Sequence, residues 1–497
     1  MIPVVSRWEQ KVRIERDKCT GCGYCLLTCP VGAIQSDGWA TIGEEKCTLC
    51  GECASVCPND AISLDVPPKE PEREYESQYD VVIIGSGIGG LMTAAALAKE
   101  GRRVGVFEKL PFIGGRYTEI DYRGYAVTTA AWTSLGPKSN IGEFLEEMGA
   151  PIEYVSLRDK GCPQQFTVRF KDGREFPSLQ AMLSRRDWRA YVRALVRGRK
   201  LALQDASTRD YVEEYVGNES LIDAVNAIAL TASGVDIDRF PASEYIVVTT
   251  DTARAGLDFA CTVGGVRTLI QALEDIVTSH GGQVFTNTEV GRVLLEGGNA
   301  AGVALTNGDR VEARTVIHNG GIGRFVKLVG PENLPSNYVS RVHDLVPVDC
   351  AAIILGTTEP LLTEAPILMT PGTDRVAGIF APSFLDPTVA PPGRHMVDVF
   401  LPVLSDDRTQ ELELAMGDLR SLFPDLDEAL DFMVPMFFTG TWTGAETGQT
   451  FGQVGDQRWD PQSPIPNLYL VGMDAVGSGA AGDLIPIGVR RLLDYLS

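Results

Sequence analysis

The stretch YDVVIIGSGIGGLMTAAALAKEGRRVGVFEK, residues 79–109, decides the fold of most of this chain. It predicts a strand, a glycine turn, an alanine-rich helix and a second strand. Residues 81–84 (VVII) form an unbroken apolar run, which is typical of a parallel strand buried on both faces. The sequence therefore predicts a doubly wound α/β domain around a parallel sheet.

The turn in this stretch carries a G-x-G-x-x-G motif at Gly85, Gly87 and Gly90. Gly85 permits the turn, Gly87 lets backbone amides approach a pyrophosphate, and Gly90 lets the helix pack closely on the strand. Glu108 ends the second strand, where an acidic side chain can accept hydrogen bonds from a ribose diol. A glycine turn in some other α/β domain is the alternative, but the strand, helix and acidic residue together favour a dinucleotide site.

Two cysteine runs precede this domain, CTGCGYCLLTCP at residues 19–30 and CTLCGECASVCP at residues 47–58. Each run has the spacing C-x2-C-x2-C-x3-C followed by proline, and the sequence around the first run is repeated around the second. In such runs three cysteines bind one iron–sulfur cube and the fourth reaches the other cube. The spacing therefore predicts two [4Fe–4S] clusters, one held by Cys19, Cys22, Cys25 and Cys57, the other by Cys47, Cys50, Cys53 and Cys29.

Zinc bound by C-x2-C pairs is the alternative for these cysteines. It would leave the third cysteine of each run, the x3 spacing and the proline unexplained. The remaining cysteines, Cys162, Cys261 and Cys350, are scattered, and we expect them to be ordinary buried residues. Thiols gathered in two tight runs favour a reducing compartment over a disulfide framework.

The composition argues against several classes of function. A net charge of −22 does not suit binding to nucleic acid, which depends on basic patches that contact phosphates. No apolar run approaches the ~18 residues of a membrane-spanning helix, and the N-terminus lacks the apolar segment of a signal peptide. We therefore expect a cytoplasmic protein with no membrane span, a reading that leaves peripheral membrane contact open.

Two further stretches indicate which dinucleotide is bound. KLPFIGGRYTE (109–119) places a Gly-Gly-Arg turn just after Glu108, and NLYLVGMDAVGSGAAGD (467–483) brings an aspartate and a second glycine turn. Together they resemble the FAD-dependent oxidoreductases of the phytoene desaturase, retinol saturase and amine oxidase type. Residues 259–298 and 303–321 resemble segments of the same family, and the cysteine region resembles bacterial 2[4Fe–4S] ferredoxins.

The resemblance implies particular contacts with FAD. Arg116 would lie near the phosphates, the backbone of Val290 would touch the adenine, and Asp474 would contact the sugar chain of the flavin. The turn at residues 477–482 would face the isoalloxazine. This sequence has VGMD where the family usually has VGD, so it departs from the pattern at Met473. The full set of implied cofactor residues is Gly85, Gly87, Gly89, Gly90, Glu108, Lys109, Gly115, Arg116, Val290, Gly472 and Asp474.

The predicted architecture has three parts. An α+β ferredoxin-like domain covers residues 1–66, and a charged, proline-rich linker covers residues 67–78. A doubly wound FAD domain and an α+β substrate domain share the rest. The FAD domain takes residues 79–155, 256–345 and 440–497, and the substrate domain takes residues 156–255 and 346–439. Within the substrate domain, residues 176–232 should be mainly helical and residues 350–356 and 394–404 should be strands.

No catalytic side chain can be named from the sequence. The four histidines, His280, His318, His343 and His395, occur in no spaced metal or triad motif, so we expect structural roles. His318 follows a predicted strand of the FAD sheet and is the first one to mutate. The segment VPMFFTGTW (434–442) could line an apolar pocket, although packing in the core is the commoner explanation. In this superfamily the flavin carries the redox chemistry.

The preferred function is an enzyme in which FAD exchanges a hydride equivalent with a carbon–carbon bond of an apolar isoprenoid, steroid-like or acyl substrate. The clusters would link FAD to an external ferredoxin or another one-electron protein. No second nucleotide-binding unit follows the glycine string at residues 477–482, so we expect no nicotinamide site. The alternative is an electron-transfer subunit of a larger redox complex. An amine or amino-acid oxidase is disfavoured, because oxidases return electrons to dioxygen and need no clusters.

Overall fold

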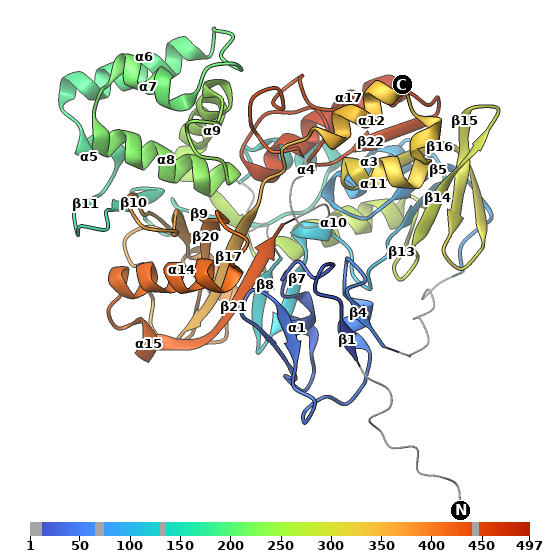
Figure 1. The fold of residues 1–497 in the computed structure, drawn as a ribbon. Helices are drawn as coiled ribbons and strands as arrows, with labels where there is room; N and C mark the ends of the chain where they lie inside the picture. Colours follow the sequence, from blue (N-terminus) through green and yellow to red (C-terminus); the bar gives the residue numbers. More distant parts are fainter. Residues whose placement is uncertain (1–11, 65–73, 130–135, 440–446) are drawn as a thin grey trace, which may run out of the picture.

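The computed structural model describes residues 12–64, 74–129, 136–439 and 447–497. Figure 1 shows a small N-terminal domain in blue, a sheet flanked by helices near the C-terminus, and a second sheet that carries a separate layer of helices in green. Within the described residues, no helix is both long enough and apolar enough to cross a membrane.

The nucleotide-binding sheet forms as the sequence predicts. Its parallel core has the order β13-β6-β5-β16-β22, and an antiparallel pair, β15 and β14, extends it from β16. Side chains alternate along β5, so Val81 and Ile83 join one apolar cluster while Val82 and Ile84 join another. The strands are β5 (Gln78–Ile84), β6 (Val104–Phe107), β13 (Gln283–Phe285), β14 (Val290–Glu296), β15 (Asn299–Leu305), β16 (Arg310–Asn319) and β22 (Leu468–Val471).

Helices cover both faces of this sheet, which gives the doubly wound arrangement. One face carries α3 (Ile88–Lys99), α4 (Asn140–Met148), α10 (Val266–Ser279) and α17 (Ile485–Leu496). The other face carries α11 (Ile322–Val329) and α12 (Ser336–His343). The glycine turn lies between β5 and α3, so the first turn of α3 faces the carboxyl edge of the sheet.

The second sheet has the order β11-β10-β18-β19-β20-β17-β21. The expected strands at 350–356 and 394–404 are confirmed as β17 (Cys350–Thr357) and β20 (His395–Pro402). The others are β10 (Phe166–Arg169), β11 (Glu175–Phe176), β18 (Ile367–Met369), β19 (Gly378–Phe380) and β21 (Leu430–Phe438). The segment 434–442 therefore falls partly in β21, and its residues 440–442 lie outside the described residues.

A layer of helices lies against this sheet, in the region expected to be helical. Ser207 caps one of its helices, because its hydroxyl oxygen accepts a hydrogen bond of 3.0 Å from the amide of Asp210. The helices are α5 (Leu179–Met182), α6 (Arg185–Gly198), α7 (Thr208–Tyr215), α8 (Glu219–Ser233) and α9 (Ala242–Ala255). Two more, α14 (Arg408–Leu422) and α15 (Leu426–Ala429), pack with the same sheet in another apolar cluster. Short pairs β7 (Glu119–Tyr122) with β8 (Tyr125–Thr128) and β9 (Tyr154–Ser156) with β12 (Ala260–Thr262) complete the flavoprotein part, together with α13 (Pro382–Leu385).

The N-terminal domain consists of two similar halves, as the repeat predicts. Helix α1 (Tyr24–Thr28) and helix α2 (Glu52–Ser55) each follow a glycine in the left-handed region, with φ of 79° at Gly23 and 84° at Gly51. Strand β1 (Arg13–Ile14) pairs with β4 (Ile62–Ser63), and β2 (Ile34–Ser36) pairs with β3 (Ala40–Ile42).

This domain packs on the rest of the chain, in part through the first cysteine run. Tyr24 and Leu27 are buried against a cluster that includes Val434 and Met436 of β21. The amide of Phe437 donates to the carbonyl of Gly21 at 3.0 Å. The loop and helix that carry Cys19, Cys22 and Cys25 therefore make part of the contact, and Arg408 adds a hydrogen bond to the carbonyl of Gly38.

The predicted linker differs from expectation in its second half. Residues 65–73 lie outside the described residues, but Tyr75 packs edge-on against Phe107 and Phe285 with ring centroids 5.8 Å away in each case. The charged residues and prolines around Tyr75 predicted a linker with few side chains to bury. One aromatic ring is enough to fix the chain on the edge of the FAD sheet.

Candidate functional site

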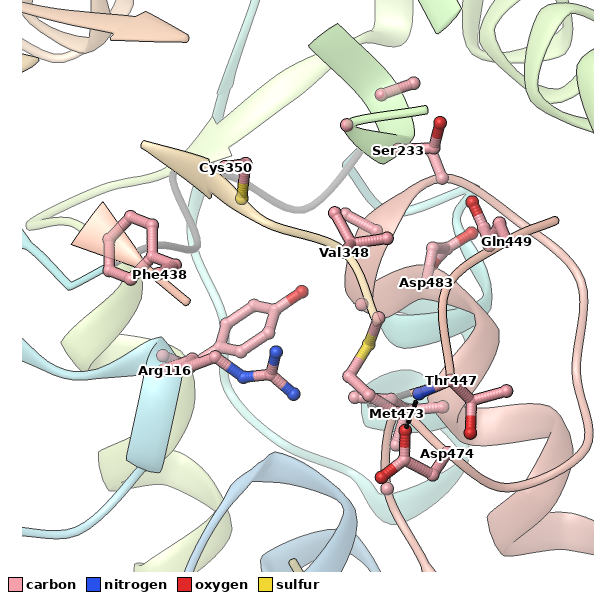
Figure 2. A pocket seen from close by; sticks show the side chains of 18 of the residues that line it. Arg116, Ser233, Val348, Cys350, Phe438, Thr447, Gln449, Met473, Asp474 and Asp483 are labelled. Carbon is pink, nitrogen blue, oxygen red and sulfur yellow. Dashed lines mark hydrogen bonds between the residues drawn. The ribbon is translucent and has the colours of Figure 1, made fainter. Parts of the chain in front are cut away.

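One cavity of about 1600 Å³ extends from the glycine turn of the FAD sheet into the substrate domain. All but one of the residues predicted to contact FAD line it, and the exception, Gly90, packs behind the turn. The far end is lined by apolar side chains of the helical layer and the second sheet, among them Trp188, Leu195, Ile228, Phe259 and Ile367. The fold thus joins a nucleotide cleft and an apolar chamber in one space (Figure 2).

The glycine turn is tight because Asn319, the last residue of β16, fills its inner side. A Cβ on Gly87 would lie 2.6 Å from Asn319 Nδ2, and a Cβ on Gly90 would lie 2.4 Å from the carbonyl oxygen of Gly85. Gly85 itself has φ of 93°. Asn319 belongs to no sequence motif, and its place at the carboxyl end of a central strand is the one signal of its role.

Glu108 lies at the cleft and is nearly buried. Its Oε2 accepts hydrogen bonds of 2.8 Å from the amide and the hydroxyl of Ser86, and its Oε1 accepts one of 2.9 Å from the amide of Leu110. The carboxylate therefore ties the glycine turn to the end of β6. Because a carboxylate has about four lone-pair sites, one remains for a ribose hydroxyl, and that contact stays a prediction.

The Gly-Gly-Arg turn lies directly over the glycine turn. The amide of Gly114 donates to the carbonyl of Ser86 at 3.0 Å, and Gly115 has φ of 59°. This places Arg116 on the cavity wall, and Figure 2 shows its guanidinium pointing across the cavity toward Met473. A cation in this position can bind phosphate or another anionic part of a cofactor.

Asp474 lies on the opposite wall and is buried. Its Oδ2 accepts from the amide of Ile322, which begins α11, at 3.0 Å, and its Oδ1 accepts from the amide of Thr447 at 2.8 Å. Gly472 lies next to the glycine turn. Met473, the residue by which this sequence departs from the family pattern, turns its thioether into the cavity and lines the site (Figure 2).

Lys109 and Val290 also line the cleft, but Lys109 has partners that the sequence did not indicate. Its Nζ lies 2.7 Å from Asp60 of the ferredoxin domain, 3.2 Å from the carbonyl oxygen of Pro58 and 3.7 Å from Glu289. Lys109 therefore joins the two domains at the edge of the cleft. Its predicted contact with FAD stays a prediction.

Polar atoms without partners show that the cavity suits a polar cofactor. Among the described residues, Thr447 Oγ1 and Gln449 Oε1 are buried and have no hydrogen-bond partner, and both residues line the cavity. The amide nitrogen of Gln449 donates to the carbonyl of Gly479 at 2.9 Å, which fixes the side chain. Unpaired buried oxygens are costly, so a ligand with donors at this end of the cavity would stabilise the site.

His318 faces the cleft as a neutral side chain. Nε2 lies 3.1 Å from the carbonyl oxygen of Gly321, so Nε2 carries the proton and Nδ1 has no partner among the described residues. Burial lowers the pKa of His318 to about 4. Near neutral pH the ring is therefore uncharged, and its N–H is engaged with the carbonyl oxygen of Gly321, which agrees with a structural role.

This pKa predicts a pH dependence of stability. An unfolded histidine titrates near ~6.5, so between that pH and about 4 the unfolded chain binds more protons than the folded chain. Neutral His318 therefore stabilises the fold above pH ~6.5, and this contribution is lost as the pH falls, by about 2 kcal/mol at pH ~5.

We expect His318→Gln, which can still donate to Gly321, to lose less unfolding free energy than the native protein between these pH values in urea titrations. Exposed His343→Gln is the control and should behave like the native protein; an equal pH response in both variants would contradict the assignment.

The eight cysteines of the two runs divide between two small cavities in the crossed pattern that the spacing predicts. One cavity is lined by Cys19, Cys22, Cys25 and Cys57, and the other by Cys29, Cys47, Cys50 and Cys53. In the first group, burial and the neighbouring charges of Cys57 and Cys19 raise the pKa of Cys22 to about 12. In the second group, burial and the charges of Cys50, Cys47 and Cys29 raise the pKa of Cys53 to about 11.

Backbone amides are directed at a sulfur of each cysteine group. In the parts of the chain that the structure describes, no three His, Cys, Asp or Glu side chains are grouped as ligands of a single ion. Amides of Ala33 and Ala61 point at Cys29 Sγ and Cys57 Sγ, each at 3.2 Å. Amides directed at the sulfurs stabilise thiolates that bind an iron–sulfur cluster. The assignment of individual ligands remains a prediction.

Together, the doubly wound sheet, its glycine cradle and the two cysteine cavities define a flavoprotein oxidoreductase with an iron–sulfur domain. Residues 88–480 match the model of the family described as flavin containing amine oxidoreductase, and residues 18–61 match that of the 4Fe-4S dicluster domain. The chain belongs to the flavin containing amine oxidoreductase family. Its cofactors are FAD and two [4Fe–4S] clusters.

Individual relatives are similar to about half of this chain or more. Prolycopene isomerase 2 of an Oncidium hybrid cultivar is 24% identical over 66% of this chain and 65% of its own length. The neurosporene-forming phytoene desaturase of Cereibacter sphaeroides is 27% identical over 49% of this chain and 53% of its own length. The crystal structure of an oxidoreductase from Methanosarcina mazei aligns with a TM-score of 0.74 and 27% identity, over 83% of this chain and 99% of that one.

Proposed function

We propose that the protein is a FAD-dependent oxidoreductase that reduces or desaturates a carbon–carbon bond of an apolar isoprenoid, steroid-like or acyl substrate. In this proposal the two clusters carry electrons between FAD and an external one-electron protein such as a ferredoxin. FAD, when bound, supplies hydride-type chemistry that can be coupled to one-electron carriers. The similarity to chains named for phytoene and prolycopene supports a long apolar polyene or a compound of like shape.

The shared wall between two cavities is the observation that carries the proposal. Lys18, Thr20, Pro58 and Asn59 line both the large cavity and the cavity of Cys19, Cys22, Cys25 and Cys57. Among the residues that the structure describes, the cavity of the other four cysteines shares no lining residue with the large cavity. The first group therefore lies next to the cleft, and the second lies farther out, where Cys50 is exposed.

This order gives each group of cysteines a distinct role. The outer group, with exposed Cys50, can approach an electron carrier of another protein. The inner group lies behind Thr20 and Pro58, which separate it from the cleft by one layer of side chains. An external ferredoxin could then exchange electrons with the buried site without entering the substrate chamber.

The side chains of the chamber favour an enzyme over a pure electron relay. Val348, Cys350, Phe438 and Met473 surround the space in front of Arg116 (Figure 2), and most of the wall beyond them is apolar. A relay subunit needs no such chamber. These residues would hold an apolar substrate against the cofactor and exclude water, while Arg116, Thr447 and Gln449 would hold polar parts of the cofactor.

The proposal predicts which donors work. Under anaerobic conditions, reduced external ferredoxin is expected to reduce the flavin rapidly, whereas NADPH and NADH should do so slowly, because the sequence contains no second nucleotide-binding unit. Stopped-flow absorbance of the flavin measures both rates. Rapid reduction by NADPH would contradict the proposed electron route. Rapid reduction by ferredoxin with no reoxidation by a panel of polyenes, steroid-like and acyl compounds would favour the relay subunit.

A further inference from the structure

Helix α6 differs in charge from the rest of this acidic chain. Residues 185–201 contain seven of the 44 lysines and arginines and one of the 66 acidic residues. All seven cations are exposed, and among the described residues none of them forms an ion pair. They are Arg185, Arg186, Arg189, Arg193, Arg197, Arg199 and Lys200.

Four of these arginines repeat at a spacing of four residues, namely Arg185, Arg189, Arg193 and Arg197. This spacing places like charges next to one another along one side of the helix. Like charges at this spacing repel each other and destabilise a helix. The arrangement is thus unfavourable within the isolated protein and becomes favourable when an anionic surface lies against it.

The same stretch, α6 and the residues just after its end at Gly198, also exposes apolar side chains. Val192, Val196 and Leu201 are 38%, 61% and 44% exposed, which makes residues 192–201 the densest group of exposed large apolar side chains in the described chain. Val192 is three residues after Arg189, and Val196 is three residues after Arg193, so each valine lies beside an arginine on the helix surface. Exposed valines between arginines suit the boundary between lipid headgroups and acyl chains.

The exposed valines are also at the opening of the large cavity. Val192 and Val196 line it, and Trp188, Tyr191 and Leu195 of the same helix line it further in. Val192 and Val196 are exposed to solvent and also line the apolar cavity, so the cavity opens to the surface beside them. Because apolar compounds are dissolved in membranes rather than in water, this mouth is best placed against a bilayer.

We propose that α6 binds the surface of an anionic membrane and holds the mouth of the cavity against it, so that the apolar substrate enters from the bilayer. The last clause rests on the proposed function, whereas the membrane contact does not. The net charge of −22 opposes broad contact with an anionic surface, so the contact must be confined to this basic helix. Figure 1 shows α6 at the far end of the helical layer from the blue ferredoxin domain, which leaves the clusters accessible to a donor.

The full-length protein with its cofactors can be tested on vesicles. We expect it to float with vesicles of equimolar phosphatidylcholine and phosphatidylserine, less with phosphatidylcholine alone, and less as salt is added. Each basic side chain near such a surface contributes about 1 kcal/mol. The triple variant Arg189→Gln/Arg193→Gln/Arg197→Gln should therefore bind the anionic vesicles about 100-fold more weakly.

A matched variant separates local charge from total charge. Arg292→Gln/Arg310→Gln/Arg314→Gln removes the same number of exposed arginines from the β14–β16 region and should bind the vesicles like the native protein. Val192→Ser/Val196→Ser should weaken binding while leaving the charge unchanged. Unaltered flavin absorbance and melting temperature show that the variants are folded.

Two results would overturn the proposal. One is absence of vesicle binding by the native protein, and the other is an equal loss of binding in both arginine triples. Self-association that only the α6 triple abolishes, without vesicle binding, would assign the helix to an acidic protein partner such as a second copy of the chain. Reduction of the flavin by ferredoxin is measured separately, so failure of the proposed function and failure of membrane binding are distinguishable.

Discussion

Replacing Cys57 with alanine is expected to damage the cluster that lies beside the flavin cleft and to leave the outer cluster intact. Cys57 belongs to the second run, but it shares a cavity with Cys19, Cys22 and Cys25 of the first. Since each cube contains four irons, anaerobically prepared Cys57→Ala should retain about four of about eight iron atoms. Its flavin should no longer be reduced rapidly by reduced ferredoxin, while dithionite should still reduce it.

Two further variants make this result specific. Cys29→Ala should have the reciprocal effect, with loss of the outer cluster and an EPR signal that differs from that of Cys57→Ala. Cys162→Ala is the matched control, because Cys162 is buried in the substrate domain, where its thiol donates to the carbonyls of Gln164 and Glu364. It should keep all the iron. Loss of the outer cluster from Cys57→Ala would show that each run ligates its own cube.

Most of the architecture could be predicted because its signals are local. The apolar run at residues 81–84, the glycine turn and Glu108 are close in sequence, and each has one dominant structural cause. The crossed division of the cysteines follows from the geometry of a cube. The first three cysteines of a run bind three corners of one cube, and the fourth cysteine of that run ligates the other cube. The structure adds that the two cysteine groups differ in position, with one beside the cleft and the other outside.

What could not be predicted depends on contacts between segments far apart in the chain. Asn319 fills the glycine turn from another strand, and its position at the end of that strand does not show which turn it contacts. Lys109 has the position of a cofactor ligand in sequence, yet it pairs with Asp60 of the preceding domain. Tyr75 anchors a segment whose composition is that of a linker. In each case the partner is set by tertiary packing between distant segments, and for Lys109 by the contact between two domains, which hydrophobic periodicity does not report.

The apolar chamber could not be predicted either, because it too is formed by segments that lie far apart in the chain. Its lining comes from α6, α8, α9 and the second sheet, and each of those segments reads in sequence as ordinary amphipathic or core structure. Only their assembly around the end of the nucleotide cleft makes a space of about 1600 Å³. Arg116 was identified because a glycine turn marks it, whereas Thr447 and Gln449 carry no motif.

Substitution of Gly90 by alanine is expected to weaken FAD binding strongly, although Gly90 does not line the cavity. A Cβ at this position would lie 2.4 Å from the carbonyl oxygen of Gly85 and 3.1 Å from the side chain of Asn319. The nearest atom is backbone, so the turn itself must move. Overpacking of this kind costs about 1–3 kcal/mol, and the upper end corresponds to about 100-fold in affinity.

The glycine in the middle of α14 provides the control for this experiment. A Cβ on Gly417 meets nothing within 4 Å, so Gly417→Ala should leave FAD binding unchanged and stabilise its helix by about 1 kcal/mol. FAD affinity is measured by fluorescence titration of protein freed of flavin, with far-UV circular dichroism to confirm folding. If Gly90→Ala binds FAD as tightly as the native protein, the turn does not hold the pyrophosphate. Because alanine removes no hydrogen-bonding group, a loss confined to Gly90→Ala would show that the cradle acts through the position of its backbone amides.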